Sequence, residues 1–421
     1  MSDLPLLEFN PKLPKLSKNE RKVLDLLVEA GKLIAPIYLE QEKQAKNDSF
    51  SSSPYTVVEK VKGKLVATPY HVKYAKLLKP VAEKLEEAAK VSDNKQFANA
   101  LKVQAKALLD GTYEKAIATW LKMPPYILDI SIGPVVYFDE QLFFAKASYQ
   151  AWVGVINEKR TKRLKLYEDV ALATHRKALI PGERIEENHL VKSKVDDVLL
   201  FSGLMARTKF IGVNLPNDLQ WVKKYGSEIT LFENANDFRM EEQIIPAFNK
   251  FFSPGFRQGF SREDLRRASL RYVALHEIAH SYLYYKNAFT KLQDLLPALY
   301  ELSATVLGMR IAGSLLVKDI ITDKQLVSMF VTFICRSFYL IEQYKKTKFM
   351  GNYALGGVIF INFMLENGAL KQYKGLAIPN FVKMFVSLHD LFYILEKLLS
   401  SGTRKDAVDF IKKYGKLTDM I

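Results

Sequence analysis

The sequence predicts an α+β protein with two lobes, of which one mixes helices with strands and the other is almost wholly helical. Its 421 residues exceed the length at which a single hydrophobic core usually stops growing, so two lobes are expected. β-Branched residues and proline breaks gather in residues 123–138 and 195–234, whereas the chain after Pro254 keeps helical spacing of its apolar residues almost throughout. These patterns favour a mixed first half and a helical second half.

The elements of the first half follow from spacing and turn residues. Apolar positions recur at helical spacing from residue 19 to about 45, and residues 72–121 form a second helical stretch rich in Ala, Lys, Leu and Glu. Between them TVVEKVKGKLVAT alternates around Lys62 and Gly63, which predicts a β-hairpin. Residues 123–138 are expected to form strand and loop, residues 140–180 a helix, and residues 195–234 short strands with turns.

Composition and charge limit the classes of partner. The chain carries 61 Lys and Arg against 46 Asp and Glu, a net charge of +15, which on its own is compatible with nucleic-acid binding. The basic residues are scattered or lie in short clusters such as 159–165, so no nucleic acid is expected, and a basic rim that attracts acidic peptides is the more specific alternative. No apolar run reaches the roughly 18 residues needed to cross a bilayer without a charge, so no membrane partner is expected.

The single cysteine and the N-terminal residues bear on the compartment. Cys335 lies in an apolar run, so a disulfide framework is excluded and a place in the core is expected. The first residues lack the basic start and apolar stretch of a secretion signal. We therefore expect a cytoplasmic protein.

The run HEIAH, residues 276–280, is the strongest chemical signal in the sequence. Ser261 and Asp264 form a capping-box pattern that opens a helix expected to run through His280, with Asn287 as a candidate stop. Positions i and i+4 share one face of a helix, so His276 and His280 can place two imidazole nitrogens on one metal ion. The alternative is a pair of structural histidines that binds no metal.

A third ligand is expected from the next helix, LPALYELSATVLGMRIAG (296–313), with Pro297 in its first turn. Glu301 is the only acidic residue of this apolar run, and an unpaired carboxylate there would cost several kcal/mol. The separation of 21 positions between His280 and Glu301 allows a connection and an antiparallel helix that returns the carboxylate to the histidines. The alternative is a glutamate that reaches solvent.

These residues define the chemistry that the sequence predicts, which is that of the gluzincin metallopeptidases. His276, His280 and Glu301 would hold one Zn²⁺ ion and leave its fourth position for water, whose pKa zinc lowers to about 7. Glu277 is placed to accept the proton of that water and to deliver it to the leaving amine. The expected reaction is metal-assisted hydrolysis, most often of a peptide bond.

Several segments together resemble the dipeptidyl peptidase III family of zinc metallopeptidases, over roughly residues 125–415. They are ISIGPVVYFDEQLFFAKASYQAWVGVIN (130–157), GVNLPND (212–218), a five-residue form of the metal motif in HEIAH, YELSAT (300–305), and GNYALGGVIFINFMLENGAL (351–370). The resemblance puts Glu301 on the third zinc ligand. It implies a helical zinc-binding lobe, a lower lobe around a small β-barrel, a wide cleft between them, and an oligopeptide substrate laid along an edge strand. The implied lower lobe is residues 1–156, joined by strands from about 195–203 and 219–243, and the helical catalytic lobe is residues 157–421.

The resemblance also implies roles for single residues. Asn214 and Asn217 match two asparagines that hold the N-terminal region of the peptide, with turn formation around Pro216 as the alternative. Tyr353 falls on the family's histidine that stabilises the transition state. A phenol can still donate to an oxyanion, and a core aromatic is the alternative for this residue.

Other positions depart from the family pattern. Val136 replaces the glutamate that grips the free amine of the substrate, and Phe138 replaces the tyrosine that follows it. Tyr137 is the remaining candidate for that tyrosine's role. Strict release of dipeptides is therefore not expected.

The residues around the third ligand depart as well, because Tyr300 and Thr305 replace two acidic residues that flank it in the family. Such neighbours orient ligating histidines, and Asp294 is a candidate substitute. Two functions remain open. One is a zinc-dependent metallopeptidase that cleaves oligopeptides, and the other is a catalytically impaired peptide-binding or scaffold protein that keeps the fold.

Overall fold

The computed structural model describes residues 4–45, 53–136, 146–177, 191–216, 218–283, 285 and 287–417. The chain divides into two compact units. Unit 1 comprises Met1–Thr161 and Glu187–Ala235, and unit 2 comprises Lys162–Glu186 and Asn236–Ile421. Unit 1 combines helices with a sheet and unit 2 is mainly helical, so the predicted α+β class is confirmed. The lobe boundaries and the cleft expected from the family resemblance remain predictions.

Most helices of unit 1 lie in the two segments in which helical spacing was found, and two short helices follow among the later strands. Ser17 and Glu20 form a capping box at the start of the helix that begins at Lys18. Asn94 caps the helix that begins at Lys95, and Gly111, with a left-handed φ of 78°, is the C-cap of that helix. The helices are α1 (Lys18–Lys32), α2 (Ile34–Ala45), α3 (Tyr70–Lys73), α4 (Ala75–Val91), α5 (Lys95–Asp110), α6 (Tyr113–Lys122), α8 (Leu204–Thr208) and α9 (Leu219–Tyr225). Helix α7 (Glu158–Lys177) begins in unit 1 and continues into unit 2.

A six-stranded sheet forms the centre of unit 1. Its strands are β1 (Leu6–Glu8), β4 (Leu128–Val136), β5 (Ser148–Ile156), β6 (Val191–Gly203), β7 (Gly212–Leu215) and β8 (Ser227–Phe232). The order is β4-β5-β6-β8-β7, with β1 also paired to β6, and only the β6–β8 pair is parallel. No pairing joins β4 to β7 among the described residues, so the expected small barrel takes the form of an open sheet there.

Strand β5 corrects one expectation, since residues 140–180 were predicted as helix. Residues 148–156 form a strand, and helix begins only at Glu158, while residues 140–145 lie outside the described residues. The sequence SYQAWVGVI is buried on both faces of the sheet, so it shows the continuous apolar run of a central strand instead of alternation. Such a run cannot be told from a buried helix by periodicity.

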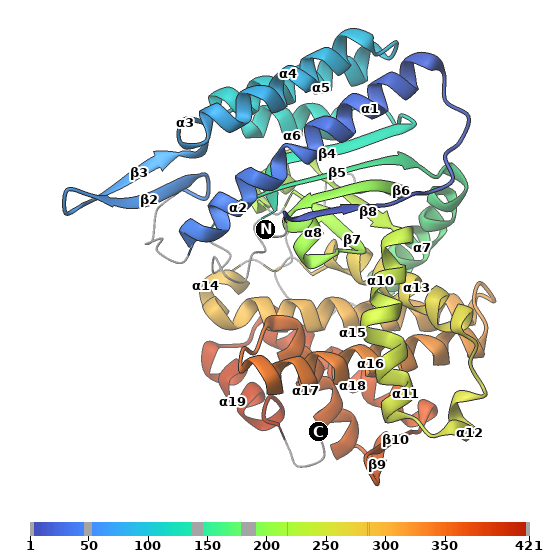
Figure 1. Ribbon diagram of the computed structural model, residues 1–421. Helices are drawn as coiled ribbons and strands as arrows, with labels where there is room; N and C mark the ends of the chain where they lie inside the picture. The colour runs from blue at the N-terminus through green and yellow to red at the C-terminus, as the bar shows by residue number, and fades with distance from the viewer. Residues whose placement is uncertain are drawn as a thin grey trace. The chain divides into compact units, whose positions relative to one another are not determined.

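Both faces of the sheet are covered by apolar side chains. Helices α1, α2, α4 and α5 lie over one face (Figure 1), and their side chains pack with those of β4, β5 and β6 in the main core of unit 1. On the other face, Phe232 makes edge-to-face contacts with Trp152 and Phe201, at centroid distances of 5.1 and 5.0 Å. The sheet therefore supplies two cores to this unit.

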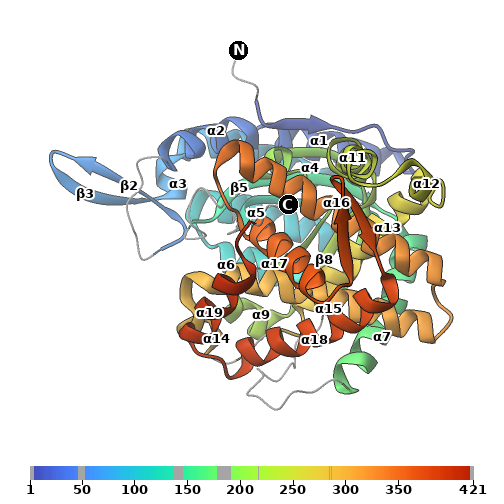
Figure 2. The ribbon, with the colours of Figure 1, turned by 90° about the horizontal axis from the view of Figure 1, so that it is seen from below.

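The predicted hairpin is confirmed. Strands β2 (Thr56–Val61) and β3 (Lys64–Pro69) pair in an antiparallel register from Thr56–Pro69 to Val61–Lys64. Lys62 and Gly63, at the turn, have φ of 49° and 83°, as a two-residue turn with positive φ at both positions requires. The hairpin stands away from the six-stranded sheet (Figure 2).

Unit 2 is built from helices that pack around α13, α15 and α16. Its helices are α10 (Asn236–Arg239), α11 (Ile245–Phe251), α12 (Pro254–Arg257), α13 (Arg262–His280), α14 (Ala288–Leu292), α15 (Leu296–Val317), α16 (Asp323–Thr347), α17 (Asn352–Glu366), α18 (Phe381–Ser400) and α19 (Arg404–Tyr414). A π-helical turn, η3 (Met240–Ile244), joins α10 to α11, and β9 (Leu370–Tyr373) pairs with β10 (Leu376–Pro379). Helix α13 packs on α15 and α16, and α17 packs on the same two helices.

The predicted capping box of α13 is confirmed, whereas the predicted stop is wrong. Ser261 and Asp264 exchange both hydrogen bonds of the box. The helix ends at His280 with Ser281 as its C-cap, and Asn287, in a left-handed conformation with φ of 67°, instead precedes α14. A left-handed Asn can end one helix or stand before the next, which spacing alone does not distinguish.

Two stretches of unit 2 are long and apolar enough to cross a membrane, Ala288–Val317 and Asp323–Thr347. The shares of their most apolar windows that are buried inside the protein are 72% and 67%. Burial of this extent is typical of core helices, and α15 and α16 indeed pack on α13.

A cluster of buried polar side chains is formed by residues of strands β4, β5, β6 and β8 of unit 1. Lys194 Nζ is 2.9 Å from Asp129 Oδ1 and also binds Glu228, while Trp152 Nε1 donates to Asp129 Oδ2 over 3.0 Å. Asp196 is fully buried beside them, and burial, followed by the negative charge of Asp129, raises the pKa of Asp196 well above its usual range. Asp129 is thus the ionised carboxylate and Asp196 the protonated one.

We expect Asp196→Asn to change how stability depends on pH. The Asp196 pKa is raised by folding, so its contribution to the free energy of unfolding is complete below the unfolded value of about 3.9 and is lost as pH rises through the folded-state pKa. An amide does not titrate, so the urea midpoint of the variant relative to wild type should rise between pH 4 and pH 8. Asp25→Asn on the exposed side of α1 is the control, and parallel curves for Asp196→Asn and wild type would contradict the assignment.

Candidate metal centre

Helix α13 brings the two histidines of HEIAH together on one face. His276 and His280 are one turn apart, and their Nε2 atoms lie 3.1 Å from each other. Both side chains are buried, with exposed fractions of 4% and 9%. At this distance one imidazole can donate to the other, and when both nitrogens present lone pairs a cation between them removes their repulsion.

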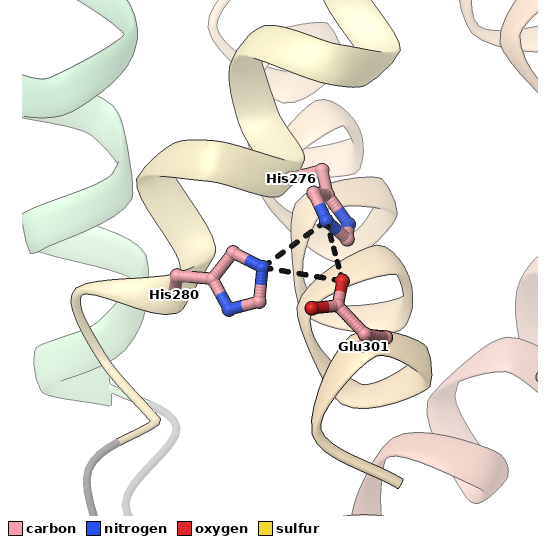
Figure 3. Close-up of side chains that lie close together, drawn as sticks. All are labelled: His276, His280 and Glu301. Atoms are coloured by element: carbon pink, nitrogen blue, oxygen red, sulfur yellow. Dashed lines mark hydrogen bonds and ion pairs between the residues drawn. The ribbon is translucent and has the colours of Figure 1, made fainter. Parts of the chain in front are cut away.

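Glu301 on α15 supplies that partner. Its Oε2 atom lies 3.1 Å from His276 Nε2 and 3.5 Å from His280 Nε2, and its side chain is also buried (Figure 3). Pro297 stands in the first turn of α15, as predicted, so Glu301 enters the site one turn further along. The three residues predicted as metal ligands therefore converge in the structure.

The approach of α15 to α13 depends on Gly308. A Cβ atom added to Gly308 would lie 2.9 Å from the carbonyl carbon of Leu275 and 3.0 Å from the amide nitrogen of His276. Gly308 lies seven residues after Glu301 and so shares its face of α15. The backbones of the two helices touch at this point, which sets the distance between Glu301 and the histidines.

The donor set fits a zinc ion. Ligands at about 2.0–2.1 Å from a tetrahedral ion lie about 3.3 Å from one another. The three donor distances here, 3.1, 3.1 and 3.5 Å, scatter around that value, and all three donor atoms lie within 4.8 Å. Two imidazoles and one carboxylate are also the ligand types that zinc prefers in catalytic sites.

Neighbouring hydroxyl groups fix the orientation of the histidines. His276 Nδ1 lies 3.1 Å from Thr305 Oγ1, which lies 3.1 Å from the hydroxyl of Tyr272. With its proton on Nδ1, His276 donates to Thr305 and presents the lone pair of Nε2 to the site. Tyr300 stacks near the His280 ring at a centroid distance of 4.8 Å and donates to the His280 carbonyl oxygen.

Asp294 does not take part in this arrangement, so its expected role as a substitute is wrong. Its side chain is 69% exposed and forms an ion pair with Arg404 over 2.8 Å. It lies in the turn η4 (Gln293–Leu295) ahead of α15, where its carboxylate is engaged at the surface. Thr305 makes the contact to His276 instead.

The protonation of the three converging groups follows from their burial and mutual charge. Burial lowers the pKa of His276 to about 4, against the opposing hydrogen bond of Glu301. Burial alone would lower the pKa of His280 and raise that of Glu301, but their attraction outweighs it, so the His280 pKa is raised and the Glu301 pKa is lowered. Without metal the site therefore holds an anionic Glu301, a neutral His276 and a His280 that takes up an extra proton more readily than a free imidazole, and a divalent cation competes with that proton.

Glu277 lies between the two histidines in sequence and is partly buried. Burial raises its pKa to about 7, against the opposing positive charge of His280. A carboxylate with a pKa near neutrality is suited to accept and return a proton at physiological pH. The local environment thus gives Glu277 the property that a general base needs.

Tyr353 at the start of α17 borders the same site. Its ring lies 6.4 Å from the His276 ring and 4.7 Å from the guanidinium carbon of Arg336. Desolvation of its hydroxyl, and next the negative charge of Glu301, raise the pKa of Tyr353 well above its usual range, although 36% of the residue is exposed. Tyr353 is therefore a neutral phenol at the edge of the site.

The other residues predicted to belong to the site lie in unit 1 or outside the described residues. Asn214 lies in β7 opposite Ile229 of β8. Asn217 and Tyr137 lie outside the described residues. Their substrate-binding roles stay predictions.

Several residues beside the site were not predicted from the sequence. Tyr272 precedes His276 by one helical turn, so its place on the same face could have been found from spacing. Arg336 is a charged residue inside the apolar run of α16, and the argument applied to Glu301 would have marked it too. Gly308 carried no such signal, because its importance arises from a contact with another helix.

Comparisons with known proteins agree with this fold. No family model matches the sequence. The structure of DPP III from Caldithrix abyssi superposes with a TM-score of 0.82 at 19% identity, covering 96% of this chain and 92% of that one. Dipeptidyl-peptidase III from Corallococcus sp. strain EGB gives 0.79 at 20% identity, covering 98% and 91%. The chain therefore has the dipeptidyl peptidase III fold, as the resemblance implied.

A plant protein is similar in sequence. Nudix hydrolase 3 of Arabidopsis thaliana is 23% identical over 363 residues, which cover 84% of this chain and 46% of that protein. The chain spans about half the length of this curated relative.

We expect Gly308→Ala to destabilise the protein although alanine is the better helix former by about 1 kcal/mol. The added methyl group meets the backbone of Leu275 and His276, and overpacking of this kind costs about 1–3 kcal/mol. Gly356→Ala in α17 is a matched control, because its Cβ would lie 3.5 Å from the nearest atom of Leu302. Urea unfolding should show a lower midpoint for Gly308→Ala alone, and equal midpoints for both variants would contradict the close contact.

Proposed function

We propose that this chain, whose fold is that of dipeptidyl peptidase III, is a zinc-dependent metallopeptidase that hydrolyses peptide bonds of oligopeptides. The observation that carries the proposal is the convergence of three donor atoms from His276, His280 and Glu301 at the spacing of a tetrahedral zinc site. Glu277, with a pKa raised to about 7, adjoins the site. The expected cytoplasmic location belongs to the same proposal.

His276, His280 and Glu301 would hold one zinc ion. When bound, the ion would supply Lewis acidity that polarises the scissile carbonyl group and makes a water molecule easier to deprotonate. Glu277 would accept the proton of the attacking water and pass it to the leaving amine. In the metal-free protein the pKa of Glu277 is about 7, so its carboxylate can both accept and release a proton at neutral pH.

Tyr353 would stabilise the developing negative charge on the carbonyl oxygen. A neutral phenol held beside Glu301 can turn its proton toward an oxyanion, and a donor of this kind contributes to transition-state stabilisation in many acyl-transfer enzymes. Asn214, Asn217 and Tyr137 would bind the main chain of the peptide. This part of the proposal follows from the family resemblance.

A peptide-binding or scaffold protein is the second candidate, since Val136 and Phe138 replace the family residues that grip the substrate's amine. The metal site and Glu277 favour catalysis, because a pure binding protein has no need of a general base beside a metal. The two candidates differ in turnover. Activity that a chelator removes and zinc restores would eliminate the scaffold.

We expect Glu277→Gln to abolish peptide cleavage while zinc is retained. The amide cannot accept a proton, and loss of general base catalysis lowers rates by roughly 100- to 10,000-fold. The measurement is zinc content by elemental analysis together with a peptide-library digest read by mass spectrometry. Glu263→Gln, at the exposed first turn of α13, serves as the control with unchanged activity. Full zinc occupancy without any cleavage by the wild-type protein would overturn the proposal.

We expect Thr305→Val to weaken zinc binding by roughly 10- to 100-fold, as loss of a group that orients a metal ligand does. The isopropyl group fills the same volume but offers no acceptor to His276 Nδ1. Competition with a chromogenic chelator measures the affinity without reference to activity. Thr305→Ser keeps the hydroxyl and should bind zinc nearly as wild type does. Equal affinities of all three proteins would show that the hydroxyl does not support the ligand.

A further inference from the structure

Helix α18 of unit 2 is apolar on two faces, of which only one is buried. The buried face, which includes Met384, Leu388 and Leu391, belongs to the side on which α18 packs with α15. The outer face carries Val382 and Val386, whose exposed fractions are 79% and 60%. A helix that is apolar all round normally lies inside a protein, so the composition of α18 indicates that a second apolar surface covers its outer face.

The exposed side chains of the outer face form one row. Val382, Val386, His389 and Tyr393 follow one another at spacings of four, three and four residues, which places them along one side of the helix. At 1.5 Å per residue the row runs for roughly 16 Å. Continuous exposed apolar rows of this kind, as opposed to single exposed residues, mark surfaces that bind a partner.

Two opposite charges border the row on the same side. Lys383 and Asp390 are seven residues apart, which is about two helical turns, so their side chains leave the helix in nearly the same direction. Both residues are exposed, and neither forms an ion pair within the described part of the chain. The border of the row therefore offers one free cation and one free anion to a partner.

This pattern of apolar and charged residues is complementary to itself. When two α18 helices pack antiparallel about a two-fold axis near Val386, the apolar rows face each other and the same border of each helix lies beside that of the other. Lys383 of one copy is then level with Asp390 of the second copy, because each lies three to four residues from the axis. The symmetry produces this ion pair twice.

We infer that the outer face of α18 is a dimer interface, which the same face of a second copy of this chain covers. Burial of the two apolar rows favours association, and the Lys383–Asp390 pairs select the antiparallel orientation and its register. An anionic membrane fits this face less well, because Asp390 beside the row would be repelled. The inference goes beyond the proposed peptidase function and does not depend on it.

Both ends of α18 are fixed, so the face is formed before a partner binds. At the first turn, Asn380 Oδ1 accepts from the amide of Lys383 over 3.0 Å. At the last turn, Lys291 Nζ donates to the carbonyl oxygen of Ser400 over 2.9 Å. Association therefore orders little more than the exposed side chains, which keeps its entropic cost low.

The first test is the mass of the full chain in solution, measured by sedimentation equilibrium over a range of protein concentrations. The net charge of +15 makes two copies repel each other at low ionic strength, so the salt concentration is set to about 0.15 M, where charges further apart than about 8 Å are screened. We expect a reversible dimer with twice the mass of one chain. A monomer at every concentration would overturn the inference.

A substitution at the axis locates the interface. Val386→Lys places a charge at the centre of the paired rows and should raise the dimer dissociation constant roughly thirtyfold or more, as losses at the centre of an interface do. Leu65→Lys is the matched control, because Leu65 in β3 of unit 1 is an apolar residue that is 65% exposed. Equal dissociation constants for Val386→Lys and wild type would place the interface elsewhere and contradict the inference.

Charge reversal tests the pairing of Lys383 with Asp390. Lys383→Glu and Asp390→Lys each bring like charges together at two symmetric positions, so each should weaken the dimer by roughly tenfold. The double variant restores opposite charges and should return the dissociation constant close to that of wild type. Recovery of this kind is not produced by misfolding, and a double variant weaker than both single variants would overturn the pairing.

Cysteine cross-linking tests the antiparallel orientation. Cys335 is the only cysteine of the chain and is buried, so an introduced cysteine reacts alone. Val386→Cys should form a disulfide between two copies under mild oxidation, because the two-fold axis passes near it. Lys397→Cys on the same helix should not, because the axis separates its two copies by roughly 30 Å along the helices. Cross-linking at both positions belongs to a parallel pair and would overturn the inference.

Vesicles of anionic phospholipid test the competing occupant of the face. A wild-type protein that stays monomeric but sediments with the vesicles, and loses this property in Val386→Lys, would assign the outer face of α18 to a membrane and overturn the dimer. A dimer that does not sediment with the vesicles is the expected result.

Discussion

The close contact between α13 and α15 at Gly308 is the constraint on which the rest of the site depends. The two helices that carry the three buried polar side chains approach to backbone contact at Gly308, and a side chain at this position would hold them apart. Burial disfavours isolated charges, so the protonation states of His276, His280 and Glu301 depend on one another. Geometry and electrostatics therefore have the same origin in helix packing.

The features that could be predicted from the sequence are those set by local spacing. The hairpin around Lys62 and Gly63, the capping box at Ser261, and the helix that carries Glu301 all follow from patterns within a few residues. The convergence of Glu301 with the histidines was also anticipated, because a lone carboxylate in an apolar helix requires a counter-charge. Local rules thus predicted the three side chains that converge, and the resemblance to a family predicted the fold.

The features that escaped prediction depend on contacts between distant segments. Strand β5 is buried on both faces, which removes the alternation that would have identified it. Thr305 was counted as the loss of an acidic neighbour, yet its hydroxyl contacts His276 together with Tyr272.

All three candidate ligands belong to unit 2, and this placement has a thermodynamic consequence. A ligand that binds only the folded form of a structure stabilises it by mass action, in proportion to the logarithm of the free ligand concentration over its dissociation constant. Ion binding at His276, His280 and Glu301 would act directly on unit 2. The resistance of the helical unit to heat would then vary with metal supply, whereas the sheet of unit 1 would rely on its own two apolar cores.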